Sequence, residues 1–218
     1  LQLLEGIHAA DLAEVLETLE EEERTFIFEK LSPEMAADVL VEFDQDERIE
    51  LIASYSSEEI AQELVGNMDS DDAADLLSEL SDDLTREVLS QVEDVEQAKR
   101  IAQLLTHEED TAGALMATEL VKVSEDLTAL RCVAAMRNQA ENIDKVHAVY
   151  VVNDDEILVG TLSLKKLLTA KRTDNISDLY RPIEHSVLST VPAEDVANMM
   201  QKYDLFILPV VNAAGELL

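Results

Sequence analysis

The chain has 218 residues, a net charge of −32 at pH 7 and an apolar content of 47%, and this apolar content excludes a disordered acidic tail. So acidic a chain is a poor partner for nucleic acid, and for an anionic membrane surface, because both carry the same sign of charge. Its apolar runs are far shorter than the roughly 20 residues that a membrane-spanning helix needs, and no signal-peptide pattern opens the sequence. We therefore expect a soluble piece.

The acidic residues are concentrated in the first half. Residues 1–100 hold 30 Asp and Glu against 6 Lys and Arg, whereas residues 101–218 hold 18 against 10. Charge of this density opposes a compact state unless something cationic neutralises it, which can be dissolved salt or a specific partner. The single cysteine, Cys132, excludes an internal disulfide and suits a reducing compartment.

One segment recurs four times along this acidic half, with starts 24, 24 and 25 residues apart; the copies span 7–16, 31–40, 55–64 and 80–89. Each copy opens on a small or polar residue followed by acids, which favour a helix N-terminus, and then carries apolar residues at helical spacing. Further short helices are expected between the copies, over 44–55 and 70–80. Helix pairs of this kind stack into a right-handed or HEAT-like superhelix.

Most of the acids are explained by helix starts and solvated faces, but the run from Asp69 to Asp75 is different. Asp71 and Asp75 are four residues apart, and Asp72 and Asp75 three apart, so each pair shares a helix face. Such like-charge pairs cost a few tenths of a kcal/mol each, and a divalent cation would reverse the sign of that effect. Two interpretations of this acidic run therefore remain open: carboxylates that are merely solvated, or a binding site for a divalent cation.

The pattern changes near residue 110, where short β-type runs alternate with helices. Expected strands are 120–123, 146–152, 157–161, 186–190 and 206–211, and expected helices are 127–139, 163–170 and 193–203. The pattern predicts one β-α-β-β-α unit followed by a second that stops inside its hairpin, where residues 216–218 begin another strand. Because an unpaired edge strand invites aggregation, we expect the chain to be a fragment of a longer protein.

Several of these residues carry a resemblance to a known family. The segments 115–116, 150–153 and 160–167 resemble a CBS domain, and 204–215 resembles a second one. Tandem CBS domains behind an acidic helical repeat, joined by residues 109–116, resemble the cytosolic half of an MgtE-type magnesium transporter. The resemblance implies an α+β multidomain protein. Its expected parts are an all-α, right-handed superhelical N domain over 1–106, CBS domain 1 over 113–176 and an incomplete CBS domain 2 over 177–218.

In that family the cytosolic region senses Mg²⁺, which holds the domains together and favours the closed pore. The resemblance implies that Mg²⁺ is the cofactor and that its ligands lie on the acidic helix, in the linker and in the second CBS unit. Carried over position by position, the implied metal ligands are Asp71, Asp75, the backbone carbonyl of Ala114, Glu194 and Asp204. Further acids of the family's site would lie beyond Leu218, and Pro192 stands near a position where relatives can carry another acid.

The resemblance also implies partners: a second copy of the chain through the CBS domains, and the protein's own transmembrane domain, absent from this chain. It implies a location at the cytoplasmic face of the inner membrane. Nucleotide-binding CBS domains carry Ser/Thr-x-x-Asp after the hairpin, and here Ser163 is followed by Lys166 in place of the acid. The lysines could still attract phosphate, but the ribose ligand is absent, so adenine-nucleotide binding is possible but unsupported by the sequence.

No catalytic pattern is present, so we expect no enzyme. The four histidines lack metal-ligand spacing, Cys132 is expected to be a core residue in the middle of its helix, and no phosphate loop or nucleophile elbow occurs. The alternative to a magnesium sensor is an acidic protein-interaction module that uses the CBS units for dimerisation and binds no specific metal.

Overall fold

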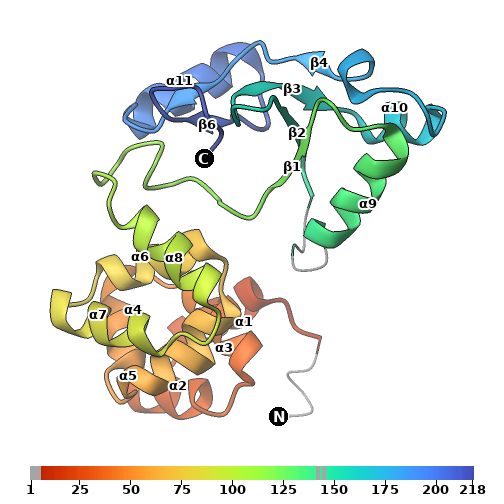
Figure 1. The fold of residues 1–218 in the computed structure, drawn as a ribbon. Helices are drawn as coiled ribbons and strands as arrows, with labels where there is room; N and C mark the ends of the chain where they lie inside the picture. Colours follow the sequence, from red (N-terminus) through yellow and green to blue (C-terminus); the bar gives the residue numbers. More distant parts are fainter. Residues whose placement is uncertain (1–5, 141–142, 144–145) are drawn as a thin grey trace. The chain divides into compact units, whose positions relative to one another are not determined.

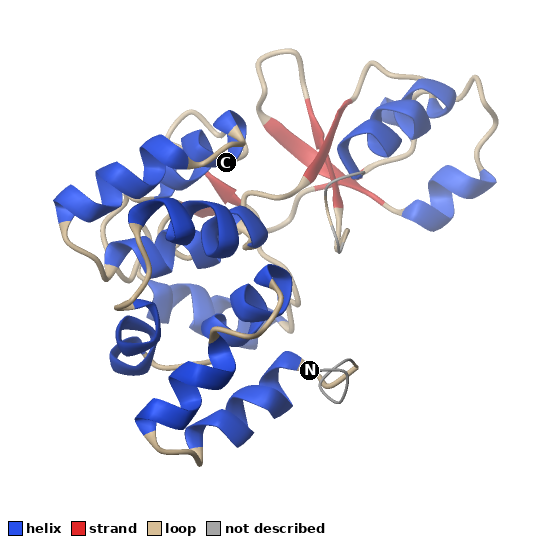
Figure 2. Cartoon of the chain, turned by 90° about the horizontal axis from the view of Figure 1, so that it is seen from below, coloured by secondary structure: helices blue, strands red, loops and turns tan. Residues whose placement is uncertain are grey.

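The computed structural model describes residues 6–140, 143 and 146–218, and divides the chain into two compact units, Leu1–Thr106 and His107–Leu218 (Figure 1). The first unit is helical and the second is built around two small sheets (Figure 2). No helix among the residues described is long and apolar enough to cross a membrane.

The first unit confirms the predicted alternation of repeated and intervening helices. Its α-helices are α1 (Ala9–Glu17), α2 (Glu21–Phe28), α3 (Pro33–Val41), α4 (Gln45–Ile52), α5 (Ser57–Glu59), α6 (Ser70–Ser78), α7 (Asp82–Gln91) and α8 (Val95–Leu104). The polar residues before the repeated helices do cap them. The Ser32 hydroxyl accepts from the Met35 N–H and the Ser81 hydroxyl from the Leu84 N–H, which satisfies N–H groups that have no partner inside the helix.

The helices stack along the repeat: α1 packs on α3, α5 on α7, and α6 on α8. Their inward faces are buried, and among them Phe28, Leu40 and Leu77 are almost fully buried. A helix pair of this length cannot bury its apolar face alone, so each unit of the repeat depends on its neighbours.

The third repeat departs from the α-helix expected over 55–64. After the short α5 the chain continues as a π-helix, Ile60–Leu64, and a 3₁₀ turn, Val65–Asn67. The carbonyl groups of Val65 and Met68 are bound by the side-chain amide of Gln97 on α8, at 3.0 and 2.9 Å. This irregular turn is therefore bound by Gln97, a residue about 30 positions further along the chain, which the local sequence could not indicate.

The second unit contains a mixed four-stranded sheet in the order β1-β2-β3-β4. Its strands are β1 (Val121–Ser124), β2 (Val149–Val152), β3 (Leu158–Leu162) and β4 (Arg181–Pro182). Strands β1 and β2 are parallel, joined through α9 (Ala129–Ala140), while β3 pairs antiparallel with both β2 and β4. The predicted hairpin is thus β2-β3. The strand β4, which follows α10 (Leu164–Thr169) and the 3₁₀ turn Ile176–Asp178, was not predicted.

A second, two-stranded parallel sheet joins β5 (Val187–Leu188) to β6 (Val210–Val211), with α11 (Ala193–Tyr203) between them. The strand predicted over 206–211 was too long, because only its last two residues pair. The last segment is not an unpaired edge: Glu216 forms a bridge with Ile157 and Leu217 with Val211. A shared apolar cluster joins the two sheets, formed by Tyr150, Val152, Leu158, Val211 and Leu217.

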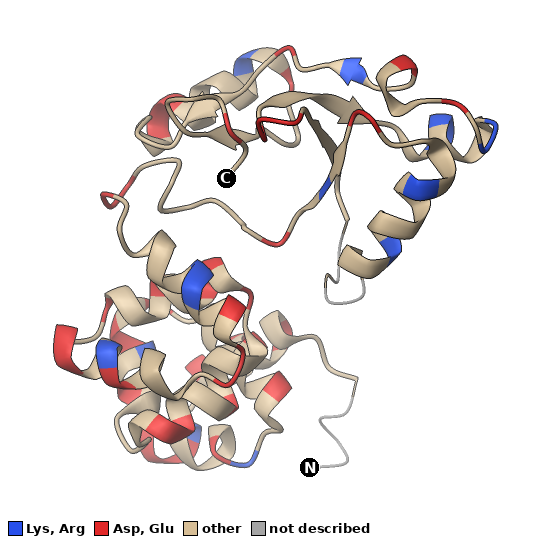
Figure 3. Ribbon diagram, in the orientation of Figure 1, with Lys and Arg blue, Asp and Glu red and all other residues tan. Residues whose placement is uncertain are grey.

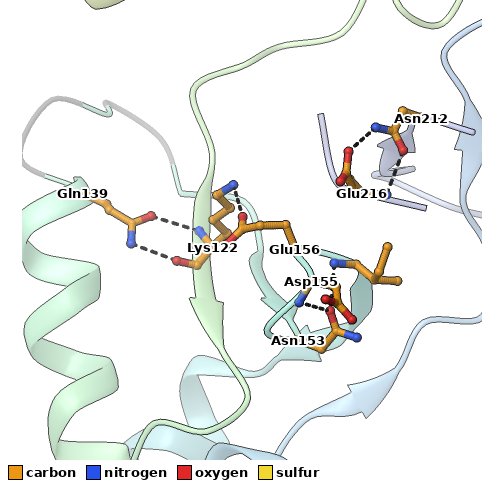
Figure 4. A network of polar contacts seen from close by, with 8 residues as sticks. Lys122, Gln139, Asn153, Asp155, Glu156, Asn212 and Glu216 are labelled. Atoms are coloured by element: carbon orange, nitrogen blue, oxygen red, sulfur yellow. Dashed lines mark hydrogen bonds and ion pairs between the residues drawn. The ribbon is translucent and has the colours of Figure 1, made fainter. Parts of the chain in front are cut away.

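The two β-α-β units have the same kind of turn after their second strand, in each case held by an asparagine side chain (Figure 4). The Asn153 side-chain oxygen accepts from the N–H groups of Asp155 and Ile157, both at 3.0 Å. The Asn212 side-chain oxygen accepts in the same way from Ala214 at 2.9 Å and Glu216 at 3.0 Å. Each turn therefore closes the hairpin of one β-α-β unit, and this internal repeat lies within the second compact unit.

Candidate functional site

The acidic residues of the first unit are spread over its helices (Figure 3). We take those of α6 as the candidate site. This helix buries Ala73, Ala74, Leu76 and Leu77 against the core. Helical periodicity then turns Asp72, Asp75 and Glu79 onto the opposite side, at positions i, i+3 and i+7. We call these three residues the α6 acidic stripe.

A cavity of about 100 Å³ lies beside this stripe within the first unit. Its lining residues are Val41, Arg48, Met68, Asp72, Asp75 and Leu76. Of the two acids predicted on this helix, Asp75 lines the cavity and Asp71 does not. Asp72 was recognised as a neighbour of Asp75 in sequence but was not chosen, and its three-residue spacing was the signal that could have selected it.

Arg48 on α4 supplies positive charge at the cavity. Its guanidinium group binds Glu79 through two bonds: Nε donates to Oε2 at 3.1 Å and Nη2 donates to Oε1. The two side chains are 19% and 10% exposed, so this pair is largely shielded from solvent. No sequence pattern pointed to it, because the partners are 31 residues apart.

The electrostatics at Asp75 reflect these neighbours. Burial raises the pKa of the Asp75 carboxyl above its usual value; the positive charge of Arg48 lowers that pKa, and the negative charge of Glu79 raises it further. Arg48 therefore favours the ionised form of a carboxylate that its surroundings otherwise disfavour.

The predicted linker residue Ala114 lies in the second unit, where backbone bonds fix the linker. The N–H groups of Ala112 and Gly113 donate to the carbonyls of Val191 and Ser189, each at 2.8 Å, and the Ala193 N–H donates to Asp110 at 2.8 Å. These bonds bring the linker beside the start of α11.

Glu194 and Asp204 occupy opposite ends of α11. Glu194 is exposed in the first turn, on the side where the linker is bound, whereas Asp204 is the exposed C-cap residue, with φ 52° and ψ 46°. Ten residues at a helical rise of 1.5 Å separate them by about 15 Å. One ion cannot contact both carboxylates, so the structure does not bring these two predicted ligands together.

Among the described residues, no group of three or more His, Cys, Asp or Glu side chains is arranged to hold a metal ion. Mg²⁺ does not require such a group, because it keeps several waters and is commonly bound by one or two carboxylates. Asp72 and Asp75 both line the cavity of about 100 Å³, together with Arg48, so two acidic residues of α6 border one space in this unit.

The second unit has a larger cavity, of about 640 Å³, between β2, β3, the start of α10 and residues 181–185. Lys165, Arg181, His147 and His185 line it, and His185 stacks on Tyr203 with ring centroids 4.3 Å apart. Lys166, at the position where nucleotide-binding relatives carry an acid, instead donates to the carbonyl of Leu179 at 3.0 Å.

An acidic helical domain followed by paired β-α-β units places the chain among multidomain proteins with CBS regions. The MgtE intracellular N domain matches residues 7–110, and the CBS domain matches residues 112–172. On these matches the chain belongs to the MgtE family, and corresponds to its N domain followed by its CBS region.

Two curated relatives are magnesium transporters. The chain is 36% identical to magnesium transporter MgtE of Enterococcus faecalis over 217 residues, which is all of this chain and 48% of that protein. It is 32% identical to MgtE of Thermus thermophilus over 124 residues, or 57% of this chain and 28% of that protein. The chain thus spans less than half the length of these relatives. Neither relative is an enzyme, in agreement with the absence of a catalytic motif in the sequence.

Two solved structures resemble the whole chain. The cytosolic domain of the Mg²⁺ channel MgtE in complex with ATP gives a TM-score of 0.89 at 29% identity, covering 99% of this chain and 88% of that one. The soluble part of a magnesium transporter gives a TM-score of 0.83 at 29% identity, covering 100% and 85%. The predicted α+β multidomain fold is therefore confirmed.

Proposed function

We propose that this chain is the Mg²⁺-sensing regulatory region of a magnesium transporter. The observation that carries the proposal is the α6 acidic stripe, in which Asp72 and Asp75 line a cavity of about 100 Å³. The family membership supports it, since the relatives are magnesium transporters. We retain the division into an N domain over 1–106 and CBS domains over 113–176 and 177–218.

The groups that we assign to Mg²⁺ are Asp71, Asp75, the Ala114 carbonyl, Glu194 and Asp204, with Asp72 added from the cavity. Since Glu194 and Asp204 lie at opposite ends of α11, they would serve separate ions. Mg²⁺ bound by carboxylates of both units would bridge them and favour the closed pore. Its loss would leave like charges facing one another, and their repulsion would separate the units.

The same proposal assigns the partners and the location. The chain would dimerise through its CBS domains and act on the transmembrane domain of its own protein, at the cytoplasmic face of the membrane. The apolar residues Leu130 on α9 and Leu164 and Leu168 on α10 are 56%, 49% and 84% exposed, which suits a helical surface that a second copy would cover.

Isothermal titration with MgCl₂, compared with NaCl at matched ionic strength, tests the sensor. We expect saturable binding with compaction in small-angle scattering, and loss of both in an Asp71→Asn/Asp75→Asn variant. A Glu21→Gln/Glu22→Gln variant removes equal charge from the exposed start of α2 and should bind as the unmodified chain does. If MgCl₂ and NaCl give the same titration heats and the same scattering, the sensor proposal fails. The chain would then be an acidic protein-interaction and dimerisation module.

A second candidate function is binding of an adenine nucleotide in the 640 Å³ cavity. The relative solved in complex with ATP motivates it, and Lys165 and Arg181 offer positive charge for phosphate. Lys166 takes the place of the ribose-binding acid, so recognition would depend on phosphate rather than ribose. Titration with ATP should then show weaker binding for Arg181→Ala than for Arg172→Ala, an exposed arginine that does not line this cavity. Equal affinity for both variants would count against this site.

A further inference from the structure

Two histidines border the cavity of about 640 Å³ in the second unit, beside its lysine and arginine. His147 lies just before β2, and His185 lies between β4 and β5. Each imidazole rests against an aromatic ring at the end of α11 or just after it. His185 stacks on Tyr203, with ring centroids 4.3 Å apart, and His147 meets Phe206 edge-on, with centroids 5.9 Å apart. These ring contacts fix both imidazoles at the wall of the cavity.

We propose that protonation of His147 and His185 controls the binding of a phosphorylated anion in this cavity, so that affinity rises as the pH falls from 8 to 6. The inference rests on the second candidate function, binding of an adenine nucleotide, and adds its regulation by pH. Histidine is the side chain whose charge ordinarily changes between pH 5 and 8. A protonated imidazole offers two N–H donors and a positive charge, and both favour contact with phosphate oxygens.

The charge of the cavity wall shows why two protons matter. Among the described residues that line the cavity, Lys165, Arg181 and Glu184 are charged at pH 8, and their charges sum to +1. Protonation of the two histidines raises this sum to +3. An anion approaches a chain whose net charge is −32 at pH 7, so it is repelled everywhere except where positive charge is concentrated. The charge of the wall therefore determines how well phosphate binds.

The charged neighbours of His185 act in opposite directions. Glu184 precedes it and lines the same cavity, and its negative charge favours the protonated imidazole. Lys202 opposes protonation, because its Nζ lies 4.8 Å from the centroid of the Tyr203 ring on which His185 stacks. With these two charges opposed, the charge of a bound ligand has a direct influence on the protonation of His185.

His147 also borders the adjoining cavity of about 410 Å³, where Glu119 is an acidic lining residue that favours protonation. Tyr150 lines both cavities, and burial raises its pKa, so its phenol stays neutral from pH 6 to pH 8. Lys165 and Arg181 repel a proton on either histidine until an anion binds beside them. Anion binding and protonation therefore favour each other, as linkage requires.

The test is calorimetric titration of the 218-residue chain with ATP, without Mg²⁺, at pH 6 and at pH 8 and at constant ionic strength. The quantity compared between variants is the ratio of the association constants at the two pH values. The terminal phosphate of ATP also gains a proton over this range, but that effect is common to all variants. We expect the ratio of the unmodified chain to exceed that of His147→Gln/His185→Gln by a factor of about three to ten, because each solvent-exposed ion pair contributes modestly.

Two further variants complete the test. His8→Gln removes an exposed histidine from the first unit and should keep the ratio of the unmodified chain. His147→Arg places a permanent positive charge at the exposed position 147, and should bind ATP at pH 8 about threefold more tightly than the unmodified chain does.

A double variant with the same ratio as the unmodified chain would overturn the inference and leave nucleotide binding in place. Absence of ATP binding at both pH values would refute the candidate function, and the inference with it. If far-UV circular dichroism shows that the double variant does not fold, His147→Arg decides by itself: an unchanged affinity at pH 8 would then overturn the inference.

Discussion

The side-chain amide of Gln97 donates to the carbonyl oxygen of Met68 at 2.9 Å, and so joins α8 to the turn that precedes the acidic helix. The same amide binds the carbonyl of Val65 at 3.0 Å, and Gln97 is only 8% exposed. A second link joins α8 to α6 itself, since Arg100 Nε donates to the Ser70 hydroxyl at 3.2 Å. The position of the α6 acidic stripe thus depends on α8.

Replacement of Gln97 by Ala should destabilise the first unit by about 1–3 kcal/mol, because two buried carbonyls would lose their donor. Urea unfolding followed by far-UV circular dichroism measures the loss. Gln103→Ala on the exposed face of the same helix is the matched control and should have little effect. Identical unfolding midpoints for the two variants would show that Gln97 does not secure the turn.

Arg24 is the second shielded arginine of the first unit and binds two acids of α4. Its guanidinium lies 2.6 Å from Glu47 and 3.0 Å from Glu50, with the Arg24 side chain 10% exposed. Arg24→Ala should cost about 2 kcal/mol, less than the 3–5 kcal/mol of a fully buried pair because both acids are partly in water.

The apolar variant Arg24→Met should cost less than Arg24→Ala, because it keeps the packing of the side-chain stem. Urea is the appropriate denaturant because it does not screen charge. Both losses should grow at low NaCl, where the excess acid of this unit repels most strongly. A loss independent of salt in both variants would argue that packing alone accounts for Arg24.

Glu59 gives a pH-dependent contribution through its capping box with Ser56. The Ser56 N–H and hydroxyl donate to Glu59 Oε2 at 2.8 and 2.7 Å, and these bonds lower the pKa of Glu59 below its usual value. Because the folded-state pKa is lowered, the contribution is complete above the unfolded pKa of about 4.5 and is lost as pH falls through the lower, folded value.

Glu59→Gln should therefore lower the urea midpoint at pH 7, and the difference from the unmodified chain should shrink as pH falls below 4.5. The exposed neighbour Glu58→Gln, which lies outside the box, is the control. A difference that stayed constant down to pH 3 would contradict the assignment of the pKa shift to these bonds.

Gly113 in the linker is required by the imidazole of His107. A methyl group at residue 113 would lie 2.6 Å from His107 Nδ1, closer than real Cβ contacts allow. Gly113→Ala should destabilise the second unit, and the double variant His107→Ala/Gly113→Ala should recover most of the loss because the obstructing ring is gone. Thermal unfolding of the three variants measures the recovery, and a double variant as unstable as the single one would rule out this contact as the cause.

The prediction of the helical unit was successful where its signals were local. Apolar spacing, Ser and Asp caps and acids in the first turns all lie within one helix, so the repeat and its intervening helices could be located before the structure was known. The π-helix at Ile60–Leu64 was missed because its accompanying partner, Gln97, lies more than 30 residues away.

The strands were predicted less well because pairing is not local. The segment over 206–211 has β-type composition throughout, but only Val210–Val211 finds a parallel partner, in β5. The strand Arg181–Pro182 has weak β composition, and exists because it lies against β3. Composition thus indicated where strands could form, and the available partners decided their length.

The sequence by itself determined the helical repeat, the concentration of acid in the first half and the family to which the chain belongs, since all three depend on residue type and spacing. Only the tertiary structure decided which groups lie beside which acids. It paired Glu79 with Arg48, brought Asp72 and Asp75 to one cavity, and separated Glu194 from Asp204 along α11. The physical reason is that charge is local to a residue, whereas the field that a carboxylate experiences depends on groups that folding brings beside it.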